Sequence, residues 1–307
     1  MQRVPFAIGC VAALAAMACS DATAPGNADP QDRTAVLGAL DQSGWFADDF
    51  GLDGAIENAT LSATGGFDLG LAPSAADSVP LVRAWGRRPG PPIGRRVTVD
   101  VANDTARVGV VMRFDGTFVL DRTDDGVRNP TEKPLQEEAV QHALLVRGDP
   151  DTAGRRWHLV ALSPHQWRMT DAAKRTVRLT RVGVWVNGTL ALVVEHPTEL
   201  FDVNDRVPRL HVGDVVRVAA TVDNATGTGN EPATFVFLHL YHAGPNARGW
   251  VRVPMRETEA GVFVREWTVR FTGRERLTVD AIDSQTFNTD SADDYRANVW
   301  AIPYRIE

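Results

Sequence analysis

Hydrophobic and polar residues alternate over much of the chain after residue 96, which is the pattern of half-buried β-strands. Five runs carry this pattern in the first part of the region: residues 97–101, 106–114, 117–120, 139–146 and 157–162. The turn-forming pairs Asn103 with Asp104 and Asp115 with Gly116 separate the first three runs. Residues 87–94 (RRPGPPIG) are rich in Pro and Gly, so we predict a loop there. An antiparallel meander is therefore expected up to residue 162.

One amphipathic helix is predicted ahead of these strands. Asp29 offers a capping side chain, and Pro30 suits the first helical turn. Three apolar residues then fall on one helix face, namely Val36, Leu37 and Leu40, and a Ser-Gly pair at residues 43–44 ends the pattern. A helix followed by a strand meander is an α+β arrangement.

The chain after residue 172 shows about eight further strand patterns. They lie around residues 177–186, 190–195, 215–222, 234–242, 251–255, 262–271, 277–281 and 299–306. Turn signals separate them, such as Asn187 followed by Gly188. Many short strands at even spacing predict a β-sandwich. The polar stretch 171–175 divides this region from the first, so we place a domain boundary between residues 172 and 173.

Both regions resemble known folds. The helix and sheet expected in residues 30–172 resemble the nuclear-transport-factor-2-like and cystatin-like folds, and residues 156–163 (RWHLVALS) resemble the last strand of the former. In residues 173–307, the segments 213–218 (GDVVRV) and 261–269 (GVFVREWTV) resemble strands of bacterial immunoglobulin-like repeats. The resemblances imply a mainly β, α+β protein: a helix with a curved antiparallel sheet, then an immunoglobulin-like β-sandwich.

The first residues have the features of an export signal. Arg3 precedes a charge-free apolar run at residues 6–17, which is too short for a comfortable membrane span. Residues 16–19 (AMAC) are similar to the lipobox of bacterial lipoproteins, in which the Cys receives a diacylglycerol group. The resemblance implies a signal peptide at residues 1–18, a lipidated Cys19 and a flexible tether at residues 19–29.

A lipidated Cys19 implies an exported protein anchored to a lipid bilayer, at the outer membrane or cell surface. The alternative is ordinary signal-peptidase cleavage near Ala18, which would leave Cys19 as a free thiol. Mass spectrometry of the mature N-terminus distinguishes the two, since only the first product carries a diacylglyceryl group.

The charge of the chain limits its partners. Its formal net charge is −7, whereas a nucleic-acid binder needs a basic face to meet phosphates. Phosphate loops, dinucleotide fingerprints and nucleophile elbows do not occur in the sequence. We therefore predict no nucleic-acid partner and no catalytic residue.

Residues 121–132 (DRTDDGVRNPTE) are the sharpest candidate for a metal site. Oxygen-bearing side chains stand there at the spacing of a calcium loop: Asp121, Thr123, Asp125, Asn129 and Glu132, with Gly126 at the sharp turn. Thr123 stands where Asp or Asn is usual, and neither flank is helical. The alternative interpretation is a solvated hairpin loop.

A second acidic cluster lies near the C-terminus and contains five carboxylates: Asp280, Asp283, Asp290, Asp293 and Asp294. The first three are the candidate ligands. Carboxylates at this density suit calcium in a sandwich loop, and the alternative is a solvated loop face. No other cofactor is predicted.

Two tryptophans are candidates for ligand binding. Trp185 shares its side of a strand with Arg181 and Asn187, and Trp250 shares its side with Arg252, so both rings are expected to be partly exposed. Aromatic rings on a β-sandwich can stack against sugar rings. The alternative is that these rings fill a seam between the two modules.

These observations favour a lipid-anchored cell-envelope protein that binds or assembles without enzymatic activity, with an envelope protein or a glycan as its partner. Two alternatives stay open. One is carbohydrate binding by the C-terminal sandwich, and the other is a small-molecule pocket or enzyme in the cone of the N-terminal module.

Overall fold

The computed structural model describes residues 28–45, 84–123, 125, 127, 129–151, 154–226, 233–243, 248–270, 273–289, 291 and 294–307. The described elements are α1 (Pro30–Gln42), β1 (Ala84–Ala102), β2 (Thr105–Asp121), β3 (Thr131–Arg147), β4 (Trp157–Leu162), β5 (His165–Met169), the 3₁₀ turn η1 (Ala172–Lys174), β6 (Val177–Val186), β7 (Thr189–Val194), β8 (Phe201–Asp202), β9 (Arg209–Leu210), β10 (Val215–Asn224), β11 (Thr234–Ala243), β12 (Arg248–Pro254), β13 (Arg256–Glu259), β14 (Val262–Thr268), β15 (Gly273–Asp283), α2 (Gln285–Asn288) and β16 (Ala297–Ile306). The protein is mainly β, as the alternation predicts, with one helix before the first described strand.

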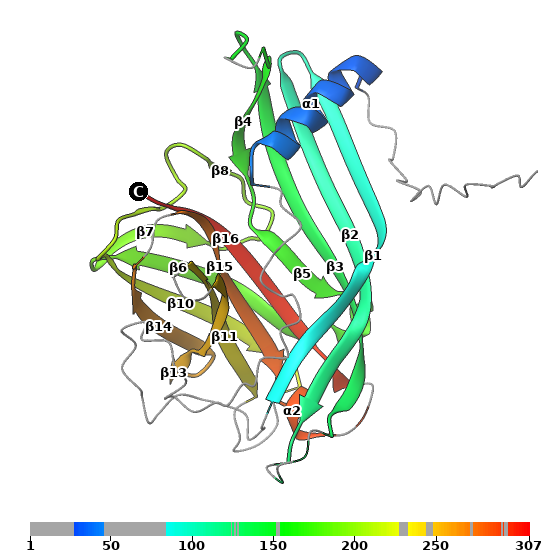
Figure 1. The fold of residues 1–307 in the computed structure, drawn as a ribbon, viewed down its shortest axis with the longest axis vertical. Coiled ribbons are helices and arrows are strands. Elements are labelled where there is room, and N and C mark those ends of the chain that lie inside the picture. Colours follow the sequence, from blue (N-terminus) through cyan, green and yellow to red (C-terminus); the bar gives the residue numbers. More distant parts are fainter. Residues whose placement is uncertain are drawn as a thin grey trace, which may run out of the picture.

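A long sheet runs through the whole molecule (Figure 1). Its strand order is β1-β2-β3-β5-β16-β15-β11-β12, with β4, β8 and β9 attached at the side. The pairing of β5 with β16 joins strands from before and after residue 172, the boundary expected from the sequence. After β5 the chain alternates between the two sheets: β6, β7, β10, β13 and β14 form the second sheet, and β8, β9, β11, β12, β15 and β16 belong to the first.

The second sheet packs face to face against the C-terminal strands of the first. Its order is β13-β14-β10-β6-β7. On β15, Leu277, Val279 and Ala281 point into the core between the sheets, as a period of two requires. The predicted β-sandwich is thereby confirmed for this part of the chain.

β1 is longer than the sequence indicates, because residues 87–94 are part of the strand and not a loop. The register of β1 on β2 shifts at Pro89, Pro92 and Gly94, so the irregular residues are accommodated as bulges. β1 is an edge strand, where a missing proline N–H costs no pairing on the outer side.

The turn predicted at Asp115 and Gly116 is also absent, since β2 continues through both residues. A Cβ at Gly116 would lie 2.4 Å from the carbonyl oxygen of Arg88 and 2.8 Å from Cα of Pro89. Glycine here allows the close approach of β1 and does not form a hairpin.

Helix α1 lies across one end of the long sheet, over β1, β2 and β3 in Figure 1. The Asp29 side chain accepts a hydrogen bond from the backbone N–H of Gln31, and Pro30 occupies the first turn, as predicted. Val36 and Leu40 are fully buried against the apolar face of the sheet. None of the described helices has the length and apolar character to cross a membrane.

The two edges of the long sheet meet at its other end. Arg252 of β12 lies over the Trp85 ring of β1 at 3.4 Å from the ring centroid, and its guanidinium donates to the Trp85 carbonyl at 2.9 Å. An aromatic core fills the space beneath this contact, including Phe118, Phe237 and Phe287. The sheet therefore curls until its first and last strands are linked through a side chain.

Candidate functional site

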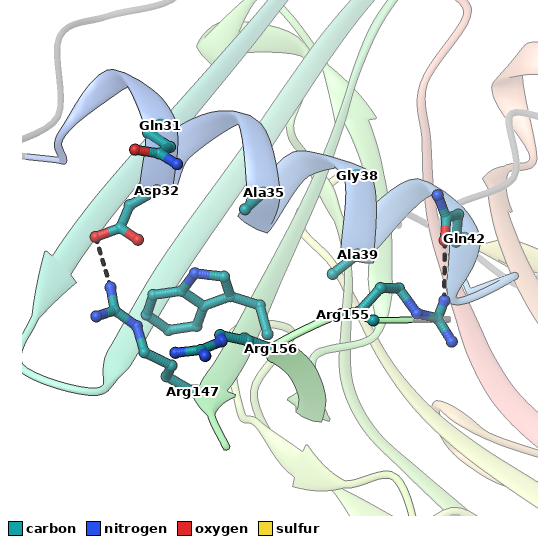
Figure 2. A pocket seen from close by; sticks show the side chains of 11 residues that line it. Gln31, Asp32, Ala35, Gly38, Ala39, Gln42, Arg147, Arg155 and Arg156 are labelled. Atoms are coloured by element: carbon teal, nitrogen blue, oxygen red, sulfur yellow. Dashed lines mark hydrogen bonds and ion pairs between the residues drawn. The ribbon is translucent and has the colours of Figure 1, made fainter. Parts of the chain in front are cut away.

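An open groove of about 620 Å³ lies between α1 and the connection from β3 to β4. Figure 2 shows the helix on one side and a set of arginines on the other. The lining residues are Gln31, Asp32, Ala35, Gly38, Ala39, Gln42, Arg147, Gly154, Arg155, Arg156 and Trp157. The volume is within the range of sites that bind small molecules and oligomers.

The helix side of the groove is shaped by small residues. Ala35, Gly38 and Ala39 follow one another at helical spacing, and a Cβ built on Gly38 meets nothing within 4 Å. The amide groups of Gln31 and Gln42 stand at the two ends of this small-residue stretch. The helix therefore leaves room for a ligand and offers amide donors and acceptors beside it.

The sheet side of the groove is formed by the end of β3 and the start of β4. Arg147 pairs with Asp32 of the helix at 2.6 Å, and its guanidinium lies 4.8 Å from the centroid of the buried Trp157 ring. Arg155 donates to Gln42 at 3.1 Å and pairs with Asp151 at 2.6 Å. These contacts hold two guanidinium groups at fixed places along the groove.

The groove is basic in an otherwise acidic protein. Three arginines and one carboxylate line it, and Asp151, which pairs with Arg155, adds a second negative charge, so these five side chains carry a net charge of +1. Arg156 is exposed and, within the described part of the chain, its side chain has no ion-pair partner. A guanidinium group binds carboxylates and other oxyanions through two parallel hydrogen bonds. The groove therefore contains groups that are able to bind an anion.

A second group of charged residues is buried inside the curled part of the long sheet. Both guanidinium Nη atoms of Arg87 donate to the carboxylate of Asp280, with one distance of 2.7 Å. The Arg87 Nε donates to the Tyr295 hydroxyl at 2.6 Å, and that hydroxyl donates to Glu137 at 2.6 Å. His239 Nε2 lies 3.2 Å from Asp280. The cluster connects β1, β3, β11 and β15 but has no opening to solvent, since all five residues are under 5% exposed.

The two carboxylates of this cluster are shifted in opposite directions. Burial alone would raise the pKa of Asp280. The charge of Arg87 and the hydrogen bonds from His239 and Arg87 lower this pKa by more than burial raises it, so the pKa of Asp280 is below its usual range. Burial raises the pKa of Glu137, and Arg87 and the Tyr295 hydroxyl offset this only in part. The Oε2 atom of Glu137 is buried with no hydrogen-bond partner among the described residues. Of the two carboxylates, Glu137 is therefore the one whose protonated form is stabilised by the fold.

The wild-type protein is expected to lose stability as the pH rises because Glu137 ionises, and replacing Glu137 by Gln is expected to prevent this loss. Because the folded pKa of Glu137 is raised, the folded protein binds more protons than the unfolded chain, and stability falls as pH rises from the unfolded pKa to the folded one. Gln still accepts from Tyr295 but cannot ionise. Urea unfolding from pH 4 to pH 9 should give equal stabilities at the acid end and a more stable E137Q at the alkaline end. A constant difference across the range would contradict the assignment.

In the structure, four residues of the predicted calcium loop are connected by hydrogen bonds within the loop. The Asp121 carboxylate accepts from the backbone N–H of Thr123 at 3.2 Å, Thr123 donates to Asn129 at 3.0 Å, and Asn129 donates to Asp125 at 3.4 Å. Glu132 is not among these four residues; its carboxylate forms an ion pair with Arg88 of β1 at 3.2 Å. Gly126 lies outside the described residues, and calcium binding here stays a prediction.

Two members of the second acidic cluster do not lie in a solvated loop, because Asp280 and Asp283 are buried in β15. Asp280 binds Arg87, and Asp283 accepts from Thr226 and from the backbone N–H of Gln285. Asp290 and Asp293 lie outside the described residues, and the half-buried Asp294 accepts a hydrogen bond from the Thr289 hydroxyl. In the part of the chain that is described, no three His, Cys, Asp or Glu side chains gather as metal ligands.

The two candidate tryptophans lie in different sheets. Trp185 is half-buried on β6, where its ring lies against Gly183 and the Arg217 guanidinium is 5.1 Å from the ring centroid. Trp250 belongs to β12 and pairs with Tyr241, and its side chain is outside the described part of the structure. Cys19 is likewise outside it. A sugar-stacking role for the two rings stays a prediction.

The arginines of the groove were not predicted as site residues from the sequence. Arg155, Arg156 and Trp157 look like the polar start of a strand, and only the fold brings them under α1. The one available signal is the density of arginine around residues 147–156, which a motif search does not register.

Comparisons with known proteins add little to this geometry. No family model matches the sequence, and no curated protein matches it. Among solved structures, the chain is similar to a polysaccharide lyase at 11% sequence identity and a TM-score of 0.19, over 69% of this chain and 35% of that chain. The chain thus spans about a third of the length of that enzyme. A likeness at this TM-score carries no argument about fold or function.

Proposed function

We propose that the protein is an exported, lipid-anchored binding protein whose groove beneath α1 takes an acidic oligosaccharide. The observation that carries the proposal is the open groove lined by three guanidinium groups and one carboxylate. The anchor is the expectation from the lipobox-like residues before Cys19. The groove and the anchor together support a tethered envelope protein that binds an anionic glycan without catalysing a reaction.

The groove suits a sugar acid better than an apolar ligand or a simple salt ion. Its polar side chains are planar groups, guanidinium and amide, which meet ring hydroxyls and carboxylates with several hydrogen bonds at once. Its apolar contribution is limited to small helix residues and the largely covered Trp157. The open form allows an extended chain to lie along the helix.

Replacing Arg156 by Ala is expected to weaken binding of oligogalacturonate by about tenfold, which corresponds to roughly 1.4 kcal/mol. Arg156 is exposed and lacks an ion pair in the described structure, so its removal should leave the fold unchanged. Isothermal titration calorimetry at low salt measures the effect. The matched control is Arg178→Ala, because Arg178 is also exposed but lies on β6 and pairs with Asp223. Equal losses in both variants would mean that binding follows overall charge and not the groove.

A further inference from the structure

Three arginines surround one carboxylate on the face of the long sheet that α1 does not cover. Glu138 of β3 lies between Arg113 of β2 and Arg168 of β5, because both are its direct partners across the strands. Arg175, just after η1, reaches the same carboxylate. We refer to Arg113, Glu138, Arg168 and Arg175 as the arginine rung.

The rung is fixed in place by its hydrogen bonds. Arg168 and Arg175 both donate to Oε1 of Glu138, at 2.8 and 3.1 Å. Arg175 also donates to the backbone carbonyls of Met169 and Thr170, at 2.7 and 3.2 Å. The Glu138 side chain is 10% exposed, so a nearly buried carboxylate holds the guanidinium groups together. Little ordering of side chains is then required when an anion binds.

The rung has more positive charge than its carboxylate can balance. Three guanidinium groups surround one carboxylate, which leaves a net charge of +2, and Asp115 lies further along β2 on the same face. Arg113 is 62% exposed, and its Nε is 3.8 Å from Glu138, which is too long for a hydrogen bond. The N–H groups of Arg113, together with the solvent-exposed N–H groups of Arg168 and Arg175, can therefore donate hydrogen bonds to an oxyanion.

The rung and the groove face away from each other. Ala139, Trp167 and Met112 belong to the core under α1, and each is adjacent in sequence to a rung residue. Neighbouring residues of a strand point to opposite faces of the sheet, so the rung lies on the face that α1 does not cover. One glycan chain in the groove therefore leaves the rung free for another.

We propose that the arginine rung is a second oxyanion site, and that the protein binds two acidic glycan chains, one on each face of the long sheet. The identity of the ligand rests on the proposed function of the groove, whereas the rung itself is a separate site. A protein with two such sites would bridge acidic glycan chains near the surface to which it is anchored.

The stoichiometry of oligogalacturonate binding tests the proposal. Calorimetric titration of the wild type should give two sites per protein, and the double variant R113A/R168Q should give one. Arg156→Ala should weaken the other site and leave the rung intact. Arg178→Ala, on the second sheet, should keep both sites. Should the double variant unfold, Arg113→Ala alone changes only an exposed side chain and should weaken the second site by about tenfold.

The outcomes separate the two proposals. A single site that only Arg156→Ala weakens would overturn the second site and leave the groove standing. A single site that only the rung variants weaken would overturn the proposed function of the groove and keep the rung. Absence of binding in the wild type would overturn both.

Discussion

Replacing Asp280 by Ala is expected to lower the free energy of unfolding by about 3–5 kcal/mol, the usual cost of removing one partner from a buried ion pair. Arg87 is 4% exposed and would keep its charge without the carboxylate that receives both of its Nη groups. Asp280 also joins β15 to β1 and His239, so its loss loosens the curled end of the sheet. Urea denaturation at neutral pH measures the change.

Asp223→Ala is the matched control for this prediction. Asp223 also pairs with an arginine, Arg178, but its side chain is 63% exposed, and exposed pairs contribute about 0–1 kcal/mol. The two variants remove the same chemical group from a strand and differ in burial. If both variants lower the free energy of unfolding by similar amounts, the buried cluster does not stabilise the fold more than an exposed ion pair does.

Replacing Gly38 by Leu is expected to weaken binding in the groove at least tenfold without lowering the stability of the fold. Gly38 lines the groove, and nothing lies within 4 Å of the Cβ position that a side chain would occupy. Leu is a better helix former than Gly by up to about 1 kcal/mol, so the free energy of unfolding should stay equal or rise. Calorimetry with oligogalacturonate and thermal unfolding measure the two effects.

The control for Gly38→Leu is Gly38→Ala. Ala gives the helix nearly the same gain in stability but adds one methyl group and leaves the groove open. Binding in the groove should therefore be retained in G38A and lost in G38L, whereas both variants should keep the site at the arginine rung. If G38L keeps the same number of sites and the same affinities as the wild type, no ligand lies along this face of α1.

The sequence predicts much of the secondary structure because period-two alternation and helix signals are local. The N-cap Asp29, the apolar face with Val36 and Leu40, and the strands of the sandwich are all found in the structure. Two errors lie at residues 87–94 and 115–116, where glycine and proline suggest turns, and the predicted runs also miss residues 131–138 of β3 and the strand β5 at residues 165–169. In the first two segments, glycine serves the close approach of two strands, which depends on the partner strand and has no local signal.

The sites were harder to predict because their residues come from distant parts of the chain. Asp280 has the appearance of an acidic loop residue, and only its pairing with Arg87, 193 residues away, gives it a buried role. The groove likewise joins Asp32 to Arg147, which are 115 residues apart. A single sequence contains no information on such pairings beyond the charges themselves. The pairing of β5 with β16 was missed for the same reason.

The most direct test of the proposed function compares two ligands that have the same sugar rings and differ in whether these carry a carboxylate or its methyl ester. Oligogalacturonate and its fully methyl-esterified form have the same sugar rings, but the second lacks the carboxylates that the guanidinium groups of the groove would bind. Calorimetric titration into the wild-type protein should show binding of the acid, weakened by added salt, and at least tenfold weaker binding of the ester. Equal affinity for both, or binding of neither, would contradict the assignment of the arginine-lined groove as an acidic-glycan site.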